Sequence, residues 1–280
     1  MKFKVALCQM NVVLNKDDNI KTAERLIREG AANGADIIGL PEIWNSPYST
    51  KHFRKNAELP GEKSYKFMSD MAKELGVYII GGSIPELEIV QGSQDGSLEP
   101  SKEKVYNTCY CFDRTGVEIG KHRKYNLFDV NITGGTVFKE SDVFSPGNKI
   151  TVLDTELGKI GVAICFDVRF PEIFKAMKDV HTVFLPAAFG LTTGPAHWEL
   201  LNRMRAVDNQ VYFASISSAR DMSGHYQAWG HSMFTNPWGV VEAEADETEQ
   251  IVYGEVDLDY VDQVRNEMPI GKQKNIAILY

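Results

Sequence analysis

Three residues of types that act in nucleophilic catalysis lie where apolar, strand-like sequence ends. A short apolar run over 160–164 stops at Cys165, and another stops just before Glu42. Lys124 is the last of four basic residues, and aromatic and apolar sequence follows it. A thiol serves as a nucleophile, a carboxylate as a general base, and a buried lysine stabilises a developing oxyanion. The three types together are those that one mechanism of cysteine-dependent hydrolysis requires.

Cys165 has two interpretations. In most proteins a cysteine at the end of a buried strand packs as a small hydrophobic residue. Here Pro171 predicts a helix that starts shortly after the cysteine. A helix N-terminus lowers the pKa of a nearby thiol and favours the reactive thiolate. The charged neighbours Asp167, Arg169 and Glu172 also argue against a purely apolar environment, so we predict a reactive thiol.

Glu42 and Lys124 are each ambiguous when taken alone. A glutamate at a strand end is more often a solvated loop residue, and the basic cluster 121–124 is typical of a solvated surface. Two features favour a function instead. Apolar neighbours would raise the pKa of Glu42, because burial disfavours its charged form. The aromatic sequence after Lys124 is expected to bury this lysine more than Lys121.

The composition limits the class of protein. With 280 residues, of which 43% are hydrophobic, the chain can bury a large core, and we expect one domain over 1–280. Its four cysteines are too few and too scattered for a disulfide scaffold, which indicates a reducing compartment. A formal charge of −8 argues against binding to nucleic acids or anionic membranes. No apolar stretch of the sequence is long enough to cross a bilayer.

Apolar periodicity predicts alternating strands and helices, which is typical of an α/β layered fold. The polar segment 88–104 is expected to be an exposed loop. The expected helices cover 20–33, 65–75, 171–178 and 196–209. The expected strands cover 3–9, 36–40, 77–84, 105–113, 149–154, 159–164, 182–189, 211–217, 229–235, 240–245 and 251–257. The strands 149–154 and 159–164 would form a hairpin that leads to Cys165.

These residues lie in longer motifs. The chain contains GLPE, HRKYNLFD, CFDVRFPE, TTGPAHWELLNRMRAVDNQVY and WGHSMFTNPWG. It closely resembles the carbon–nitrogen hydrolases of the nitrilase superfamily, and it is most similar to their omega-amidase branch. The resemblance extends from Lys4 to the last residues. It implies a four-layer αββα sandwich and a homodimer.

The resemblance also implies roles for individual residues. Glu42, Lys124 and Cys165 match the catalytic glutamate, lysine and cysteine of the family, and Glu140 matches a second glutamate beside the lysine. The glutamate would take the thiol proton, and the lysine with the backbone N–H of Phe166 would hold the oxyanion. Such a mechanism requires no metal or organic cofactor.

Omega-amidases hydrolyse the terminal amide of α-ketoglutaramate, α-ketosuccinamate and succinamate, so the resemblance implies a small-molecule amide as the substrate. The free carboxylate of such a substrate needs a cation, which Arg169 could supply as a bidentate partner. Alternatively, Arg169 forms a salt bridge with Asp167 or Glu172. Further candidates for the substrate pocket are Tyr48, Phe189 and Thr193.

Several alternatives remain open at this point. Within the superfamily, the chain could be an amidase for deaminated glutathione, an N-carbamoyl amidase or a true nitrilase. It could instead be a papain-like hydrolase in which Cys165 pairs with a histidine such as His181, or a binding scaffold without activity. The resemblance suggests the cytoplasm as its compartment, with a possible mitochondrial pool.

Overall fold

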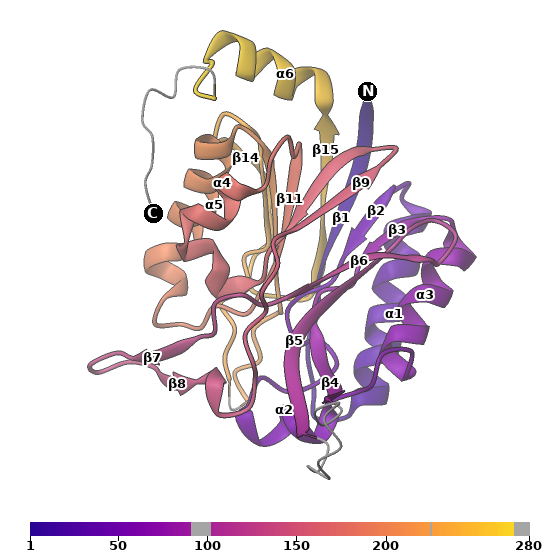
Figure 1. The fold of residues 1–280 in the computed structure, drawn as a ribbon, viewed down its shortest axis with the longest axis vertical. Helices are drawn as coiled ribbons and strands as arrows, with labels where there is room; N and C mark the ends of the chain where they lie inside the picture. Colours follow the sequence, from indigo (N-terminus) through magenta and orange to yellow (C-terminus); the bar gives the residue numbers. More distant parts are fainter. Residues whose placement is uncertain (91–101, 225, 272–280) are drawn as a thin grey trace, which may run out of the picture.

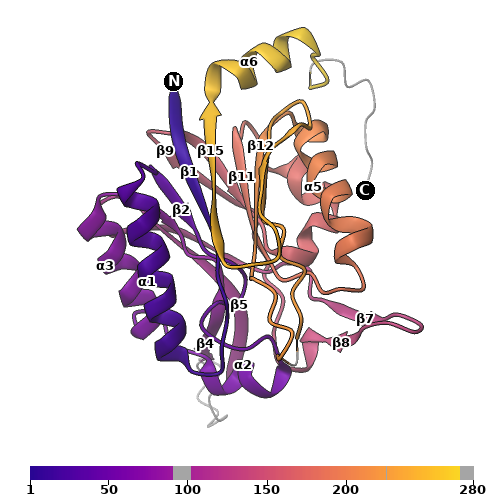
Figure 2. The ribbon, with the colours of Figure 1, turned by 180° about the vertical axis from the view of Figure 1, so that it is seen from behind.

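The protein is described by a computed structural model over residues 1–90, 102–224 and 226–271. Two β-sheets pack face to face, and helices cover the outer face of each sheet (Figures 1 and 2). Helices α1 (Lys16–Ala32) and α3 (Lys63–Leu75) lie on one side, and α4 (Pro171–Ala176) and α5 (Gly194–Asn209) lie on the other. The arrangement confirms the expected four-layer αββα sandwich.

The first sheet has seven strands within the described residues, in the order β15-β1-β2-β3-β5-β4, and β6 also pairs with β5. The strands β1, β2 and β3 are parallel, whereas β15 runs antiparallel to β1 with Lys2 opposite Asp257. Its strands are β1 (Lys2–Gln9), β2 (Ile37–Gly39), β3 (Tyr78–Ile80), β4 (Ile84–Val90), β5 (Lys102–Phe112), β6 (Glu118–Arg123) and β15 (Gln250–Asp257).

The second sheet has six strands in the described part of the chain, in the order β14-β13-β12-β11-β10-β9. Its central strands β10, β11 and β12 are parallel, so the loops that follow them emerge at one edge. The expected hairpin before Cys165 is present as β9 and β10. The strands are β9 (Thr151–Thr155), β10 (Gly158–Val162), β11 (Thr182–Ala187), β12 (Tyr212–Ser217), β13 (Met233–Thr235) and β14 (Val241–Glu244).

Helix α1 begins and helix α3 ends at residues that suit these positions. The side chain of Asn15 accepts hydrogen bonds from two backbone N–H groups in the first turn of α1, and Gly76 ends α3 with φ of +65°. Two more helices are α2 (Thr50–Asn56) and α6 (Leu258–Glu267).

Within 1–90, 102–224 and 226–271, no helix combines the length and the apolarity needed to span a membrane.

The main core lies between the two sheets, and a second core lies between the first sheet and its helices. Side chains alternate along β1: Val5 and Leu7 pack with the second sheet, whereas Ala6 and Cys8 pack with α1 and α3. Strands β11 and β12 are fully buried, which explains why their sequences are mostly apolar and carry no charged residue.

The segment 77–84 is not one strand. It contains β3 and the start of β4, with Gly81 and Gly82 between them. Gly82 has φ of +59°, and a Cβ atom there would lie 2.1 Å from the carbonyl oxygen of Pro41. The break between the strands therefore lets the chain approach the loop that holds Glu42.

Two other boundaries differ from the expectation. The ends of β4 and β5 extend into the segment 88–104 from both sides and pair there, with Glu88 opposite Lys104. The middle of that segment lies outside the described residues. The strand expected over 229–235 is shortened to β13, because the backbone N–H of His231 donates to the loop after β14.

A small hairpin of β7 (Asp129–Asn131) and β8 (Val137–Lys139) projects from the body in both views (Figures 1 and 2).

The carboxyl group of Glu86 in β4 is expected to make the free energy of unfolding depend on pH under acidic conditions. Burial raises the pKa of this carboxyl, but hydrogen bonds from Arg123, Lys121 and Thr108 outweigh that effect and lower the pKa from 4.5 to about 2. At pH values above the unfolded-state pKa, the lowered pKa adds roughly 3 kcal/mol to the free energy of unfolding. This contribution is lost as the pH falls from about 4.5 towards 2. Urea unfolding should therefore show a difference between wild type and Glu86→Gln that shrinks over this interval. A difference that stays constant would contradict the assignment.

Candidate active site

The structure brings Glu42, Lys124 and Cys165 together from both sheets. Glu42 lies in the loop after β2, Lys124 directly follows β6, and Cys165 begins the 3₁₀ helix η2 (Cys165–Arg169) after β10. Ile43 and Cys165 have φ of +50° and +46°, a left-handed conformation that residues other than glycine seldom adopt. Backbone strain of this kind concentrates at functional sites.

The carboxylate of Glu42 has one occupied and one free oxygen. Its Oε1 accepts hydrogen bonds from Asn107 Nδ2 and Lys124 Nζ, both at 2.8 Å. Its Oε2 is buried and has no hydrogen-bond partner among the described residues. Burial raises the pKa of Glu42, and the charge of Lys124 opposes this shift. The free oxygen is therefore the one available to accept a proton.

Lys124 is held between two carboxylates. Its Nζ lies 2.8 Å from Glu42 Oε1 and 2.9 Å from Glu140 Oε2, and none of the three side chains is exposed. Glu140 begins the 3₁₀ helix η1 (Glu140–Asp142) and also accepts hydrogen bonds from the hydroxyl of Tyr48 and the N–H of Phe128, both at 2.6 Å. Burial disfavours the charge of Lys124, but the two carboxylates outweigh it and raise its pKa. The lysine therefore remains an ammonium ion.

The pKa of Cys165 differs from the expectation. The thiol was expected to be acidic because a helix follows it, but burial, and then the negative charge of Glu42, raise its pKa. Lys124 and a backbone hydrogen bond from Ala188 oppose the shift without reversing it. Cys165 also begins only a 3₁₀ helix, and the α-helix that follows, α4, has six residues and starts at Pro171. The resting site therefore holds a thiol, and the nucleophile must lose its proton to a base during attack.

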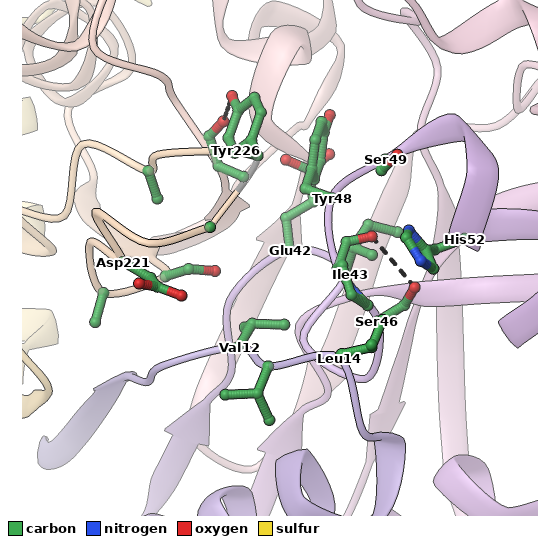
Figure 3. Close-up of a pocket in the computed structure, with 17 residues that line it drawn as sticks. Val12, Leu14, Glu42, Ile43, Ser46, Tyr48, Ser49, His52, Asp221 and Tyr226 are labelled. Carbon is green, nitrogen blue, oxygen red and sulfur yellow. Dashed lines mark hydrogen bonds between the residues drawn. The ribbon is translucent and has the colours of Figure 1, made fainter.

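Two cavities adjoin these residues. The outer cavity has a volume of about 370 Å³, and the loops after β1, β2, β11 and β12 line it. Glu42 and Tyr48 lie on its wall, and Tyr226 lies close to them (Figure 3). A smaller cavity adjoins Cys165, and Ala188 and Tyr226 line both cavities. The hydroxyl of Tyr226 donates to the carbonyl oxygen of Ala188, so this pair separates the two spaces.

The smaller cavity contains three of the residues predicted to contact substrate. Arg169, Phe189 and Thr193 line it together with Cys165. The guanidinium of Arg169 lies 5.5 Å from the ring centre of Phe166 and 5.2 Å from that of Phe189. Burial lowers its pKa, and its Nε is buried without a partner in the described parts of the chain.

Arg169 does not form the salt bridge that was considered for it. Its terminal nitrogens lie 3.3 Å from Nδ1 of His197, and no carboxylate of residues 1–90, 102–224 and 226–271 lies within ion-pair distance. Asp167 instead pairs with His122. In the described part of the chain, the guanidinium is thus a half-buried cation without a counter-charge, and it lines the same cavity as the thiol.

A family model described as carbon-nitrogen hydrolase matches residues 4–266. The chain belongs to the carbon–nitrogen hydrolase family. It is therefore an enzyme of the amidohydrolase type, as the resemblance of its motifs implied.

Two curated relatives and one crystal structure show how similar this carbon–nitrogen hydrolase is to known members. "Omega-amidase NIT2" of Danio rerio is 45% identical over 276 residues, which cover 98% of this chain and 95% of the relative. The human protein of the same name is 45% identical over 275 residues, covering 97% and 95%. Nit3 of Saccharomyces cerevisiae, a member of branch 10 of the nitrilase superfamily, has a TM-score of 0.86 at 39% identity, covering 98% and 97%.

The pairing of Cys165 with His181 is not found in this carbon–nitrogen hydrolase. His181 precedes β11, where its Nδ1 accepts a hydrogen bond from the backbone N–H of Lys159. Lys159 is near the start of β10 and Cys165 lies beyond its end, so the extended chain places them roughly 20 Å apart. The structure therefore argues against His181 as the partner of Cys165.

Three contributors to the site were missed in the sequence. Asn107 bonds to Glu42 from within β5, and a polar residue in an otherwise buried strand was a signal for it. Tyr226 offers no comparable signal, because its loop has no periodic pattern. Asp167 was noted only as a charged neighbour of the cysteine and as a candidate salt-bridge partner of Arg169. Tyr48 was predicted to contact substrate; its ring lines the outer cavity, but its hydroxyl is bonded to Glu140.

Proposed function

We propose that this carbon–nitrogen hydrolase is an omega-amidase that cleaves the terminal amide of small dicarboxylate monoamides such as α-ketoglutaramate, α-ketosuccinamate and succinamate. The observation that carries the proposal is the position of Arg169, whose guanidinium lines the same small cavity as Cys165. A partly buried cation without a counter-charge favours binding of an anion. A substrate with an amide at one end and a carboxylate at the other matches this pair. The relatives named omega-amidase support the same assignment.

In the first half of the proposed reaction a thioester forms. Oε2 of Glu42 takes the thiol proton while the sulfur of Cys165 attacks the amide carbonyl carbon. Nζ of Lys124 and the N–H of Phe166 stabilise the oxyanion, since an N–H in the first turn of a helix has no partner within that helix. Glu42 then gives the proton to the amide nitrogen, the C–N bond breaks, and ammonia leaves.

In the second half a water molecule replaces the ammonia. Glu42 accepts a proton from this water, whose oxygen attacks the thioester carbon, and the departing sulfur of Cys165 regains the proton. Glu140 contacts Lys124 and Tyr48 rather than the reacting atoms, so we assign it the role of holding the lysine in place.

The assignment of substrate is tested by ammonia release from succinamate and α-ketoglutaramate, compared with deaminated glutathione, an N-carbamoyl amino acid and a nitrile. We expect kcat/KM to be highest for the two ω-amides. If another compound in the panel is the best substrate, the omega-amidase assignment is wrong, although the family and its chemistry stand.

Arg169 is expected to select the charged end of the substrate. Replacing Arg169 by methionine should lower kcat/KM for succinamate by about 10²-fold, because a bidentate charge-assisted pair is lost. Butyramide has the same chain length without the carboxylate, so its turnover should change by less than about threefold under the same replacement. Steady-state ammonia release from both compounds measures the difference. Equal losses for the two amides would show that Arg169 does not bind the carboxylate.

We also propose the assembly and compartment of the enzyme. The main core contains residues of both sheets, which supports a single domain over 1–280. Leu200, Met204 and Val207 expose apolar surface along α5, which supports a homodimer. All four cysteines are free, which supports the cytoplasm as the compartment, with a mitochondrial pool as the alternative.

A further inference from the structure

Asp167 is a buried carboxylate that the reaction described above does not use. Both of its oxygens accept several hydrogen bonds, and its side chain has no exposed surface. Oδ1 accepts from the backbone N–H and the side-chain amide of Asn126, at 2.8 and 3.1 Å. Oδ2 accepts from Nε2 of His122 and the N–H of Ile164, both at 3.0 Å, and from the N–H of Tyr125 at 3.4 Å.

The donors come from two chain segments that carry catalytic groups. Tyr125 and Asn126 directly follow Lys124 at the end of β6, in the first sheet. Ile164 directly precedes Cys165 after β10, in the second sheet. One carboxylate therefore joins the segment of the oxyanion-binding lysine to the segment of the nucleophile.

We propose that Asp167 is a positioning residue that sets the relative placement of Lys124 and Cys165. The inference rests on the proposed function, which gives these two groups their roles. Asp167 acts through the backbone on both sides of the site and does not itself touch the substrate.

The strained backbone at Cys165 explains why such a tie is needed. With φ of +46°, Cys165 has a left-handed conformation that residues other than glycine seldom adopt and that persists only where surrounding contacts hold it. The hydrogen bond from the N–H of Ile164 to Asp167 fixes the residue immediately before it. A displacement of about 1 Å between reacting groups lowers rates by about 10²-fold.

The site also requires a carboxylate rather than an amide. All the groups around Asp167 are N–H donors, and a carboxylate offers only acceptors to them. The side-chain amide of an asparagine would point its N–H groups at the donors around one of the two oxygen positions, where no hydrogen bond can form. Consistent with this environment, burial raises the pKa of Asp167, but the hydrogen bond from His122 and the backbone N–H groups lower it overall.

The test compares Asp167→Asn with Glu58→Gln. Glu58 is also buried and accepts hydrogen bonds from a backbone N–H and a lysine, but it contacts none of the catalytic residues. Both variants are expected to lower the Tm. Below both unfolding transitions, Asp167→Asn should lower kcat by about 10²-fold with KM changed less than about threefold, whereas Glu58→Gln should keep kcat within about threefold.

A second readout does not depend on the substrate. The rate at which iodoacetamide alkylates Cys165, followed by peptide mass spectrometry, should change at least about tenfold in Asp167→Asn and less than about threefold in Glu58→Gln. This readout separates a failure of the present proposal from a failure of the omega-amidase assignment. If a folded Asp167→Asn has wild-type kcat and alkylation rates, or loses activity only as Glu58→Gln does, Asp167 is merely structural and the proposal falls.

A pair of variants at His122 covers the case in which Asp167→Asn does not fold. Glutamine can place an N–H donor near the position of Nε2 and keep the bond to Asp167, whereas leucine cannot. We expect His122→Gln to retain kcat within about threefold and His122→Leu to lose about tenfold. Equal kcat values for the two folded variants would overturn the proposal.

Discussion

Replacing Cys165 by alanine is expected to abolish ammonia release from succinamate, with kcat lowered by about 10⁴-fold or more. The reason is that the thioester cannot form without the sulfur, and no other nucleophilic side chain lines the small cavity in the described structure apart from the hydroxyls of Thr193 and Tyr226. The hydroxyl of Tyr226 is already bonded to Ala188. Ammonia release measured with an enzyme-coupled assay, together with intact-mass analysis for an acyl adduct, checks the result.

Cys109→Ala provides the matched control for this experiment. Cys109 is a buried cysteine of β5 that packs in the core between the sheets, so its replacement should affect stability more than kcat. Appreciable turnover by Cys165→Ala, or loss of turnover by a folded Cys109→Ala, would place the nucleophile elsewhere.

Replacing Glu42 by glutamine is expected to lower kcat by about 10²–10⁴-fold. The amide of glutamine can still bond to its neighbours, but the atom at the position of Oε2 no longer accepts a proton from the buried, weakly acidic thiol. Its loss should slow both halves of the reaction, because the same carboxylate serves the thiol, the leaving ammonia and the water. Single-turnover kinetics would show slow ammonia release followed by slow breakdown of the thioester.

The control for Glu42→Gln is Glu58→Gln, a similar replacement of a buried carboxylate away from the site. It should retain wild-type kcat. Wild-type rates in both half-reactions of Glu42→Gln would rule out Glu42 as the general base, and the pKa of the Cys165 thiol would then require another proton acceptor.

Local patterns in the sequence predict the alternation of strands and helices and place Glu42 and Cys165 at strand ends, whereas the αββα layering was implied by the resemblance of longer motifs. Cys165 and Glu42 both end runs of buried strand sequence, and strand ends in layered α/β proteins converge at one edge. The break between β3 and β4 was missed because Gly81 and Gly82 lie inside an otherwise continuous apolar run. It depends on a contact with Pro41, forty residues away in the chain, which no local pattern reveals.

The pKa of Cys165 could not be predicted for a similar reason. Proximity to a helix was visible in the sequence, but the burial of the thiol and its closeness to Glu42 result from packing of the two sheets. The partner of Arg169 was equally undecided, since Asp167 and Glu172 are near it in sequence. Only the folded chain shows that Asp167 is engaged with His122, which leaves the guanidinium of Arg169 without a carboxylate partner among the described residues.

The sharing of Lys124 by Glu42 and Glu140 has a consequence for the end of the catalytic cycle. The proposed substrate presents an uncharged amide to this cluster, which already holds two carboxylates against one ammonium ion. Hydrolysis converts that amide into a carboxylic acid, which ionises at neutral pH. A third negative charge then faces the cluster in a space with little water to screen it. This added charge should weaken the binding of the product relative to the amide, so we expect the diacid to inhibit the enzyme only weakly.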